Sequence, residues 1–457
     1  MAIDIVWFKR DLRIFDHSPL SLAAKNGTIL PVFIFEPELW KKPDHSYRHY
    51  MFLKEALNDL EKQLQSVGAN LTVMVGHAVD IFDKLNSQYK IKTIFSYEET
   101  WNLWTYNRDK AVRSWARANK VEWIETPKNG VVRKLGDRNG WSRRWYATMS
   151  ATLSYPPNKI ESITVRSDNI PEASHLNLST QQACSTQIAT RLQAINTLNS
   201  FLHSRGQNYT FEMSSPITAE NSCSRISPYL AFGQIHVETI WEETQKIERK
   251  SNGYRKYINE LGWREFSHSL INYFPQMLKG NLRKEFDKFP WQNNKKHLNA
   301  WKQGLTGYPI VDAGMRELYE TGWMHNRVRM ITASFLVKHL RINWTEGEKF
   351  FRDSLLDFNE ANNVAGWQWV AGCGADAAPY FRIFNPILQG EKFDPEGNYV
   401  KKWVPEISNL PKEFLHKPWE LNISIKGFEL GKTYPKPIVI HEEARNEALK
   451  AFKSIKK

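Results

Sequence analysis

The chain of 457 residues has room for two or three domains, at roughly 150 residues for each. Its 62 basic and 49 acidic residues give a formal net charge of +13, which suits a polyanionic partner but also fits a generally basic soluble protein. The three cysteines form no CxxC pair. This pattern indicates a reducing compartment and argues against zinc or iron-sulfur ligation, so no metal site is predicted.

The start of the chain, IDIVWFKRDLR, contains neither a charged leader nor a small-residue cleavage site. No later apolar run is long enough to span a bilayer, and no recurring period indicates a repeat array. We therefore expect a cytoplasmic protein that makes no membrane contact. A monomer is expected as well.

Short β-branched runs alternate with amphipathic helical patterns in the first part of the chain. The runs that predict strands are residues 3–8, 29–35, 71–75, 93–97 and 121–124. Such alternation predicts an α/β domain with a doubly wound parallel sheet. Ligands of these sheets bind beyond the carboxyl ends of the strands, here near residues 9–13, 35–37 and 97–101. No G-x-G-x-x-G follows the first strand, so the usual dinucleotide fingerprint is missing.

Between about residues 126 and 190 the composition shifts to Gly, Pro, Ser, Asn and Thr, which predicts a long connection between domains. Its segment 131–146, VVRKLGDRNGWSRRWY, suits either a solvated linker or a nucleic-acid contact. Past Arg191 helical stripes take over, up to a last helix at 441–455. We therefore expect an α/β domain over 1–127, an interdomain linker over 128–190 and an all-α domain over 191–457.

The segment NSCSRIS, residues 221–227, places hydroxyls and one arginine ahead of Pro228 and a helical stripe. Hydroxyl caps, exposed backbone donors and a guanidinium at a helix start suit a phosphate or pyrophosphate. An ordinary helix N-cap has the same spacing, so both interpretations stay open.

Several side chains further along suit contact with a flat, partly apolar ligand. The pairs that share a helix face are Glu260 with Trp263 and Asn326 with Met330. Trp367 and Trp369 are two residues apart, so on a helix they point in different directions, and one can face a buried ligand while the other lines an open cavity. Ordinary core and surface packing is the alternative for all of them.

Longer blocks of sequence carry a family resemblance. TGYPIVDAGMRELYETGWMHNRVRM and WQWVAGCGADAAPYFRIFNP resemble the two signature blocks of the DNA photolyase and cryptochrome family, and WFKRDLRIFDH resembles its N-terminal opening. The resemblance covers nearly the whole chain and is closest to class I-type cyclobutane pyrimidine dimer photolyases. It implies an α/β antenna domain joined to a helical domain that binds FAD.

The resemblance also implies which residues bind FAD. The positions that match phosphate contacts are Tyr209, Cys223, Ser224, Arg225, Ile226 and Ser227. Arg329 and Asp357 match an ion pair beside the isoalloxazine ring, and Asn359 matches a nearby flavin contact. Asn363 matches the residue that faces flavin N5, whereas alignment on the neighbouring amide would choose Asn362. A chain of three residues matches the family's electron-transfer tryptophans from flavin to surface: Trp367, Trp344 and Trp291.

The positions that contact the lesion carry the residue types of enzymes that repair cyclobutane pyrimidine dimers. These catalytic positions are Glu260, Trp263, Asn326, Met330 and Trp369, together with Asn363. The (6-4) repair enzymes place histidines where this chain has Asn326 and Met330. Further DNA contacts are implied for Arg264, Arg327 and Gln389, beside Glu260, Trp263 and Asn326.

The resemblance therefore implies light-driven repair of pyrimidine dimers in DNA, by electron transfer from excited, reduced FAD to the flipped lesion. The alternative is a cryptochrome-type blue-light sensor that binds FAD without repair. Intact lesion positions and the lack of a long C-terminal tail favour repair.

Some positions depart from the family pattern. Cys223 stands where Thr is common, Asn359 replaces a common Asp, and Val364-Ala365 replaces Asn-Gly, changes that predict an altered flavin redox balance. Trp104 and Thr105 stand where folate-binding members carry Asn and Glu. This argues against a methenyltetrahydrofolate antenna and leaves a deazaflavin, a second flavin or no second chromophore open.

Overall fold

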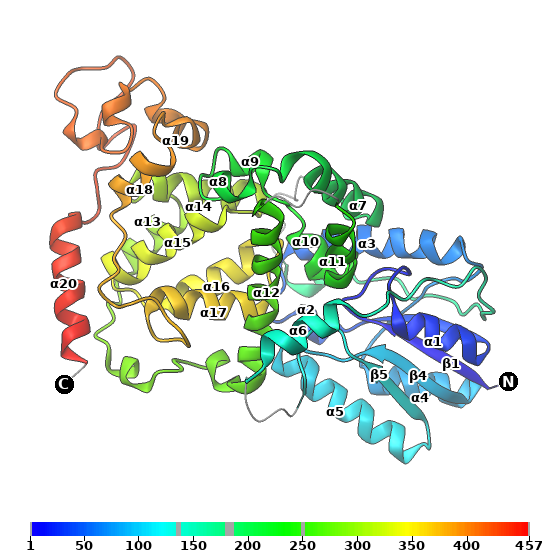
Figure 1. Cartoon of the computed structure of the whole chain (residues 1–457). Helices are drawn as coiled ribbons and strands as arrows, with labels where there is room; N and C mark the ends of the chain where they lie inside the picture. Colours follow the sequence, from blue (N-terminus) through cyan, green and yellow to red (C-terminus); the bar gives the residue numbers. More distant parts are fainter. Residues whose placement is uncertain (1, 134–138, 179–186, 248–251, 456–457) are drawn as a thin grey trace. The chain divides into compact units, whose positions relative to one another are not determined.

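The computed structural model describes residues 2–133, 139–178, 187–247 and 252–455. The chain divides into two compact units, called unit 1 (Met1–Ser204 and Ser224–Tyr273) and unit 2 (Arg205–Cys223 and Phe274–Lys457) (Figure 1). Parts of the predicted linker, residues 134–138 and 179–186 with Cys184, lie outside the described residues.

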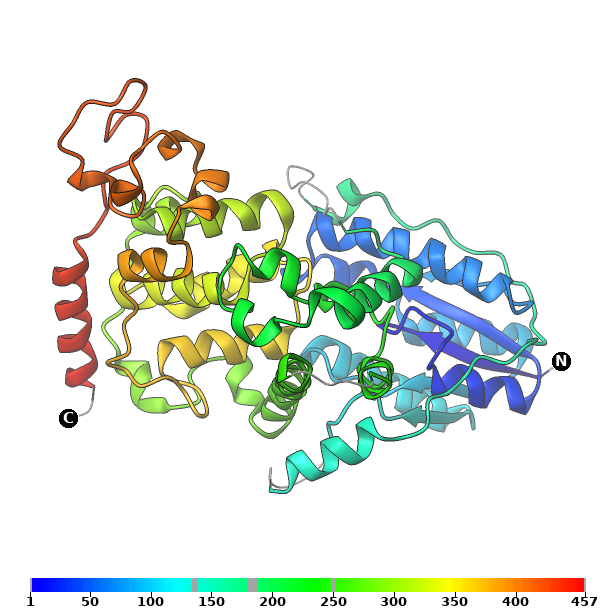
Figure 2. The ribbon, with the colours of Figure 1, turned by 45° about the horizontal axis from the view of Figure 1, so that its top comes forward.

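Unit 1 contains, within the described residues, a five-stranded parallel sheet with the strand order β3-β2-β1-β4-β5 (Figure 1 and Figure 2). The strands are β1 (Ile3–Phe8), β2 (Ile29–Phe35), β3 (Thr72–Val75), β4 (Ile91–Tyr97) and β5 (Glu122–Thr126). Strands β1 and β2 have the predicted bounds and are buried at every position, as parallel strands covered on both faces should be. The predicted α/β sheet is confirmed.

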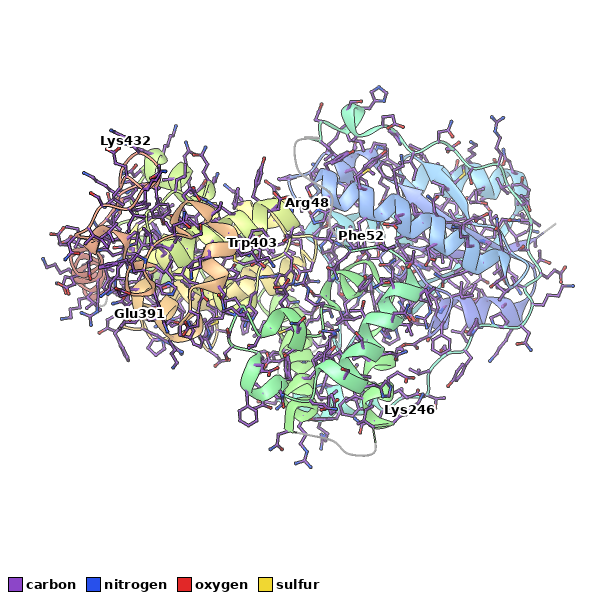
Figure 3. The ribbon with its side chains drawn as sticks, turned by 90° about the horizontal axis from the view of Figure 1, so that it is seen from above. Arg48, Phe52, Lys246, Glu391, Trp403 and Lys432 are labelled. Carbon is purple, nitrogen blue, oxygen red and sulfur yellow. The ribbon has the colours of Figure 1, made fainter. Side chains whose placement is uncertain are left out.

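Helices cover both faces of this sheet. Helices α4 (Ala78–Tyr89) and α5 (Leu103–Ala118) pack on one face, where Trp7 of β1 lies 5.1 Å from Phe82 between ring centroids. Right-handed crossovers put α1 (Ser18–Asn26) and α3 (Tyr47–Gln65) on the other face. Phe52 of α3, labelled in Figure 3, packs 4.7 Å from the ring of Phe232 in α10 (Ser227–Phe232). Buried apolar residues at helical spacing thus explain the layers.

The predicted linker contains structure that the composition did not indicate. Helix α6 (Trp141–Met149) carries Trp141 and Trp145, whose rings stack at 5.9 Å, and Trp145 is buried. Residues 161–168 run beside the sheet, where the Asp168 amide donates to the Val73 carbonyl at 2.8 Å. The tryptophans of segment 131–146 therefore pack within unit 1. The compact units also differ from the predicted domains, whose boundaries stay predictions.

The other helices of unit 1 are α2 (Pro37–Trp40), η1 (Ala173–Leu176), α7 (Arg191–Ser200), η2 (Phe201–Arg205), which ends at the first residue of unit 2, α11 (Val237–Gln245) and α12 (Asn252–Tyr273). Those of unit 2 are α8 (Tyr209–Glu212), α9 (Ala219–Ser222), η3 (Pro275–Leu278), η4 (Lys284–Lys288), α13 (Lys295–Lys302), α14 (Pro309–Thr321), α15 (Asn326–Ser334), η5 (Phe335–His339), α16 (Trp344–Ser354), α17 (Glu360–Ala371), α18 (Pro386–Phe393), α19 (Asn398–Trp403), η6 (Pro405–Ile407), η7 (Lys412–Phe414), η8 (Pro418–Glu420) and α20 (His441–Ser454). Among its described residues unit 2 has only isolated β-bridges, so the expected helical domain is confirmed.

Helices α16 and α17 lie side by side (Figure 1). At one position of their contact there is no room for a side chain. Gly347 of α16 faces the indole of Trp367 in α17, and a Cβ at this position would overlap that ring and Leu336. The start of α17 is fixed by its N-cap residue Asn359, whose side chain accepts from the Asn362 amide at 3.1 Å. The missing side chain of Gly347 therefore sets the spacing of the two helices.

We predict that Gly347→Ala destabilises the protein by about 1–3 kcal/mol, since the added methyl must displace Trp367 or separate the helices. Urea denaturation would measure this change. Gly366→Ala is the matched control, because Gly366 is exposed on α17 and a Cβ there meets no atom within 4 Å. The control should gain about 0.5–1 kcal/mol from helix propensity. Equal stability of the two variants would contradict the tight packing.

Candidate functional site

An ion pair lies at the start of α17. The Nη2 atom of Arg329, in α15, lies 3.0 and 3.2 Å from the carboxylate oxygens of Asp357, whose side chain is 6% exposed. The Nε of Arg329 donates to the Met324 carbonyl at 2.8 Å, which orients the guanidinium. The structure thus brings together the two residues predicted to pair beside a flavin ring.

The three amides near this ion pair make different contacts. The Asn362 Nδ2 donates to the side chain of the cap residue Asn359 at 2.8 Å. The Asn363 Nδ2 donates instead to α16, to the Glu348 carbonyl at 3.1 Å and to the Glu348 Oε1 at 2.9 Å. Asn362 therefore completes the helix cap, whereas Asn363 joins the two helices.

Sequence reasoning missed Glu348 and Arg352. The Glu348 side chain is 5% exposed, and each of its carboxylate oxygens lies 2.9 Å from the Arg352 Nη2. Glu348 follows Trp344 by four residues and precedes Arg352 by four, so it shares a helix face with both. A carboxylate placed among the apolar residues of that face was the available signal.

The tryptophans of α17 lie in different environments, as their spacing predicted. Trp367 is buried, with its ring 5.0 Å from that of Phe351, while Trp369 is only half-buried and lies 5.6 Å from the guanidinium of Arg382. Of the other two relay candidates, Trp344 is buried and donates to the Asn281 Oδ1 at 2.8 Å. Trp291 is half-buried, with its ring 4.4 Å from that of Phe289.

The first turn of α15 carries three candidate residues. Asn326 is exposed, Met330 is half-buried, and Arg327 lies 4.8 Å over the ring of Phe393. Burial, followed by the positive charge of Arg382, lowers the pKa of Arg327, and its buried Nε has no hydrogen-bond partner among the described residues. These side chains and the half-buried Gln389 of α18 are accessible for contact from outside unit 2.

In unit 1, helix α12 presents a large apolar ring to solvent. Trp263 is 61% exposed, with its edge against Phe266 at 5.7 Å. Glu260, one turn earlier, pairs with Lys256 at 2.8 Å, and Arg264 pairs with its neighbour Glu265. An exposed indole next to a carboxylate and a guanidinium is a typical contact surface for a flat polar ligand.

The residues predicted to bind phosphate are divided between the units. Tyr209 is buried in unit 2, where the Arg205 Nη1 donates to the Cys223 carbonyl at 2.5 Å. In unit 1, Arg225 has a φ of +59°, which residues other than glycine rarely adopt. Helix α10 begins after Ile226, whose apolar side chain cannot make a capping bond. Both interpretations of this segment, a phosphate site and an ordinary helix start, stay open.

Unit 1 also contains a small cavity, of about 60 Å³, at the carboxyl ends of β1, β2 and β4. Its lining includes Arg10 after β1, Glu36 after β2 and Trp101 after β4, as the sheet topology predicted. The Arg10 guanidinium lies 3.7 Å from the Trp101 ring.

Buried polar groups line this cavity. Arg108 pairs with Glu36 at 2.8 Å and with Glu99 at 3.4 Å. Burial alone would raise the pKa of Glu99, but Lys9 and neighbouring cations hold it at about 2. Burial lowers the pKa of His45 well below its ordinary value, so its ring is neutral. The Trp101 Nε1 and His45 Nδ1 are buried without a hydrogen-bond partner among the described residues, so both are available to a ligand.

A separate polar group, Asp16, His236 and Glu238, lies close enough together to hold an ion. However, His236 contacts Asp16 at 3.1 Å and the Lys128 carbonyl at 2.5 Å, and Thr239 donates to Asp16 at 2.9 Å. Because these contacts satisfy the group as a hydrogen-bond network, no metal is assigned to it. No helix in the described part of the chain is long and apolar enough to cross a membrane.

Comparison with known proteins agrees with this architecture. Residues 4–140 match the family model described as DNA photolyase, and residues 257–454 match that of the FAD binding domain of DNA photolyase. The "Deoxyribodipyrimidine photo-lyase" of Agrobacterium fabrum is 36% identical over 99% of this chain and 98% of its own. The "Cryptochrome-2" of Arabidopsis thaliana is 33% identical over 98% of this chain and 78% of its own.

Two solved structures extend the comparison. A bacterial class III photolyase from Agrobacterium tumefaciens has a TM-score of 0.86 and 35% identity, over 100% of this chain and 98% of its own. An archaeal photolyase from Sulfolobus tokodaii, with two FAD molecules, has a TM-score of 0.82 and 29% identity, over 99% of this chain and 100% of its own. Because class III and cryptochrome relatives match this well, the expected closeness to class I-type enzymes is not supported. The chain belongs to the DNA photolyase and cryptochrome family.

Proposed function

We propose that the protein repairs cyclobutane pyrimidine dimers in DNA under blue light. The resemblance implies five residues of the types that contact the lesion in dimer-repairing enzymes, and one structural observation carries the proposal: none of the five is buried. They are Glu260, Trp263, Asn326, Met330 and Trp369. The net charge of +13 suits a DNA substrate. The expected cytoplasmic location and monomeric state stay predictions.

The residues of unit 2 fit a flavin ring. Arg329, Asp357 and the amides of Asn359 and Asn363 offer the mixture of donors and acceptors that the polar edge of the isoalloxazine ring requires. The residues proposed to hold the phosphates are Tyr209, Cys223, Ser224, Arg225, Ile226 and Ser227. When bound in its reduced form, FAD supplies the excited electron that splits the dimer, chemistry that no side chain provides.

Each lesion residue has a proposed role that follows from its chemistry. Trp263 and Trp369 provide apolar surfaces for a flipped dimer, which leaves the duplex at low cost because it is already poorly paired. Glu260 hydrogen-bonds the pyrimidine and stabilises the charge that develops on it. Asn326 and Met330 complete the contact. Arg264, Arg327 and Gln389 contact the DNA strand around the lesion, where guanidinium groups position the backbone.

Illumination of the purified, reduced protein with a thymine-dimer oligonucleotide should remove the dimers under blue light and not in the dark. Glu260→Ala should weaken binding of this DNA by about tenfold, the size expected for one charge-assisted hydrogen bond. Glu242→Ala is a matched control, because Glu242 makes the same i,i+4 pair, with Lys246, at 2.9 Å and is also 32% exposed.

Persistence of the dimers with FAD bound would overturn the repair proposal. It would favour the alternative, a cryptochrome-type light sensor, for which the 33% identity to a plant cryptochrome is the supporting observation. Equal binding by the two glutamate variants would remove the assigned role of Glu260 alone.

We further propose that Trp367, Trp344 and Trp291 relay electrons to oxidised FAD. The two inner residues are buried and the third is half-buried, as a path from the interior to the surface requires. Trp367→Phe should slow photoreduction about tenfold or more, since phenylalanine is far harder to oxidise and the barrier to the first electron step rises. Absorption after a blue flash measures this rate.

The chemically reduced Trp367→Phe variant should still repair DNA, because that reaction bypasses the relay. Trp403→Phe provides the control for substitution itself, since Trp403 is a half-buried tryptophan of α19 (Figure 3). Loss of repair by the reduced Trp367→Phe protein would contradict the proposed role.

The cavity of unit 1 is the proposed site of a second, light-harvesting chromophore of deazaflavin or flavin type. The Arg10 guanidinium over the Trp101 ring, and the His45 Nδ1 without a hydrogen-bond partner among the described residues, support a flat aromatic ligand with polar edges. The Sulfolobus tokodaii relative, with two FAD molecules, sets a precedent for a second flavin.

A flavin or deazaflavin added to the protein should bind in this cavity with quenched fluorescence. Trp101→Ala should weaken that binding by about threefold to tenfold through loss of aromatic contact. Trp104→Ala, which alters a tryptophan outside the cavity lining, should leave the affinity unchanged. Binding of methenyltetrahydrofolate instead, or equal effects of the two substitutions, would refute this assignment.

A further inference from the structure

The hydrogen-bond partners of the Asn363 side-chain amide determine which end of this amide faces α16. Its Nδ2 contacts the Glu348 carbonyl oxygen at 3.1 Å and the Glu348 Oε1 at 2.9 Å. A backbone carbonyl oxygen can only accept a hydrogen bond, so the NH₂ group and not the carbonyl of the amide must face α16. The Oδ1 of Asn363 therefore points away from α16.

The Glu348 carboxylate accepts hydrogen bonds from Arg352 as well as from Asn363. Arg352 donates to Oε1 from Nε at 3.2 Å and from Nη2 at 2.9 Å, and it donates to Oε2 from Nη2 at 2.9 Å. Because guanidinium protons occupy both carboxylate oxygens, these oxygens act as acceptors toward any further group. The Glu360 Oε1 lies 4.0 Å from the same Nη2, which leaves Arg352 between two carboxylates. The contacts thus run from Glu360 through Arg352 and Glu348 to Asn363, and both carboxylates are buried.

The backbones that carry this chain of contacts are also held in place. Gly347, the neighbour of Glu348, lies against the Trp367 ring with no room for a side chain. The Asn363 amide nitrogen donates to the Asn359 carbonyl at 2.9 Å in the first turn of α17. The distance between Glu348 and Asn363 is therefore set by helix packing, and not by flexible side chains alone.

We propose that Glu348 is a positioning residue that presents the carbonyl oxygen of Asn363, rather than its NH₂ group, to the bound flavin. The inference rests on the proposed function and on the position facing flavin N5 that the family resemblance implies for Asn363. The Asn362 amide is held within the helix cap instead, where its Nδ2 donates to the Asn359 Oδ1 and makes no recorded contact with Glu348.

This orientation has a chemical consequence. A carbonyl oxygen at N5 accepts a hydrogen bond only when that nitrogen carries a proton, as it does in reduced flavin. An NH₂ group would instead suit the unprotonated nitrogen of oxidised flavin. By fixing the oxygen toward N5, Glu348 favours the reduced cofactor that repair requires.

The test compares three variants of the FAD-loaded protein by redox titration. Glu348→Met keeps the side-chain length but removes the carboxylate acceptor, so the Asn363 amide is held only by the Glu348 backbone carbonyl and its orientation is less strongly favoured. We expect the midpoint potential of FAD to become more negative, with a threefold to tenfold lower ratio of reduced to oxidised flavin at a fixed potential, about the effect of one hydrogen bond. Glu348→Gln keeps one carbonyl oxygen and should give a smaller shift.

Glu346→Gln is the matched control for lost charge on α16, because Glu346 is 41% exposed and pairs only with Lys349 at 3.5 Å among the contacts the structure records. It should leave the potential unchanged. A merely structural role for Glu348 would lower the melting temperature of the protein without moving the potential.

A double-mutant cycle decides whether Glu348 acts through Asn363. In an Asn363→Ala background, Glu348→Met should produce no further shift in potential, whereas additive shifts would overturn the proposal. An unchanged potential in a folded, FAD-loaded Glu348→Met protein would overturn it as well. If that variant does not fold, Glu348→Gln decides by the same criteria. If the protein binds FAD but repairs no dimers, the proposed function is wrong. The redox titration would then still decide whether Glu348 orients the Asn363 amide.

Discussion

The contact between α16 and α17 is the constraint on which the candidate flavin site depends. Each helix carries a pair of residues four apart: Trp344 and Glu348 on α16, Asn363 and Trp367 on α17. Residues at this spacing share a helix face, so one interface aligns both pairs. Gly347 sets the separation, because any side chain there would overlap the Trp367 ring. A close-packed interface transmits small changes in volume, so the spacing between the two tryptophans, which are the proposed electron relay, and the Asn363 amide depends directly on the glycine.

Buried charge is handled differently in the two units. In unit 1, Arg108 lies 2.8 and 3.4 Å from Glu36 and Glu99, which follow strands β2 and β4, and 2.8 Å from Asp109, its neighbour on α5. Removing such groups from water is unfavourable unless they are paired, and the pairing here leaves some neighbouring polar atoms of the cavity without partners. In unit 2, Glu348 and Arg352 leave no oxygen of the carboxylate without a donor. The first arrangement supports the proposed ligand site of unit 1, whereas the second holds the Asn363 side chain.

The sequence predicted those parts of the fold that depend on local pattern. Strands β1 and β2 were located from β-branched runs, and the opposite environments of Trp367 and Trp369 followed from their spacing. Helix α6 was missed, because its glycine, asparagine and arginine neighbours resemble a linker and its tryptophans become buried only through tertiary packing. The division into compact units likewise depends on contacts between distant segments, which no local pattern encodes.

In the candidate site, residue types were predictable but orientations were not. Glu348 and Arg352 have the i,i+4 spacing of an ordinary exposed helix pair, and only the burial of Glu348 against α17 distinguishes them. The direction of the Asn363 amide depends on this one contact between helices, so it could not be inferred from the sequence around Asn363.

Two of the departures from the family pattern, Val364 and Asn359, have side chains in different environments. Val364 is 1% exposed and packs in the interior, so it does not line a cavity that a flavin could enter. The Asn359 side chain accepts a capping hydrogen bond from the Asn362 amide, as an aspartate would. Asparagine in place of aspartate therefore removes a negative charge but keeps the capping hydrogen bond. Neither change alters the hydrogen bonds of Asn363. We therefore expect the redox balance of a bound flavin to depend more on the proposed Glu348 contact than on Val364 or Asn359.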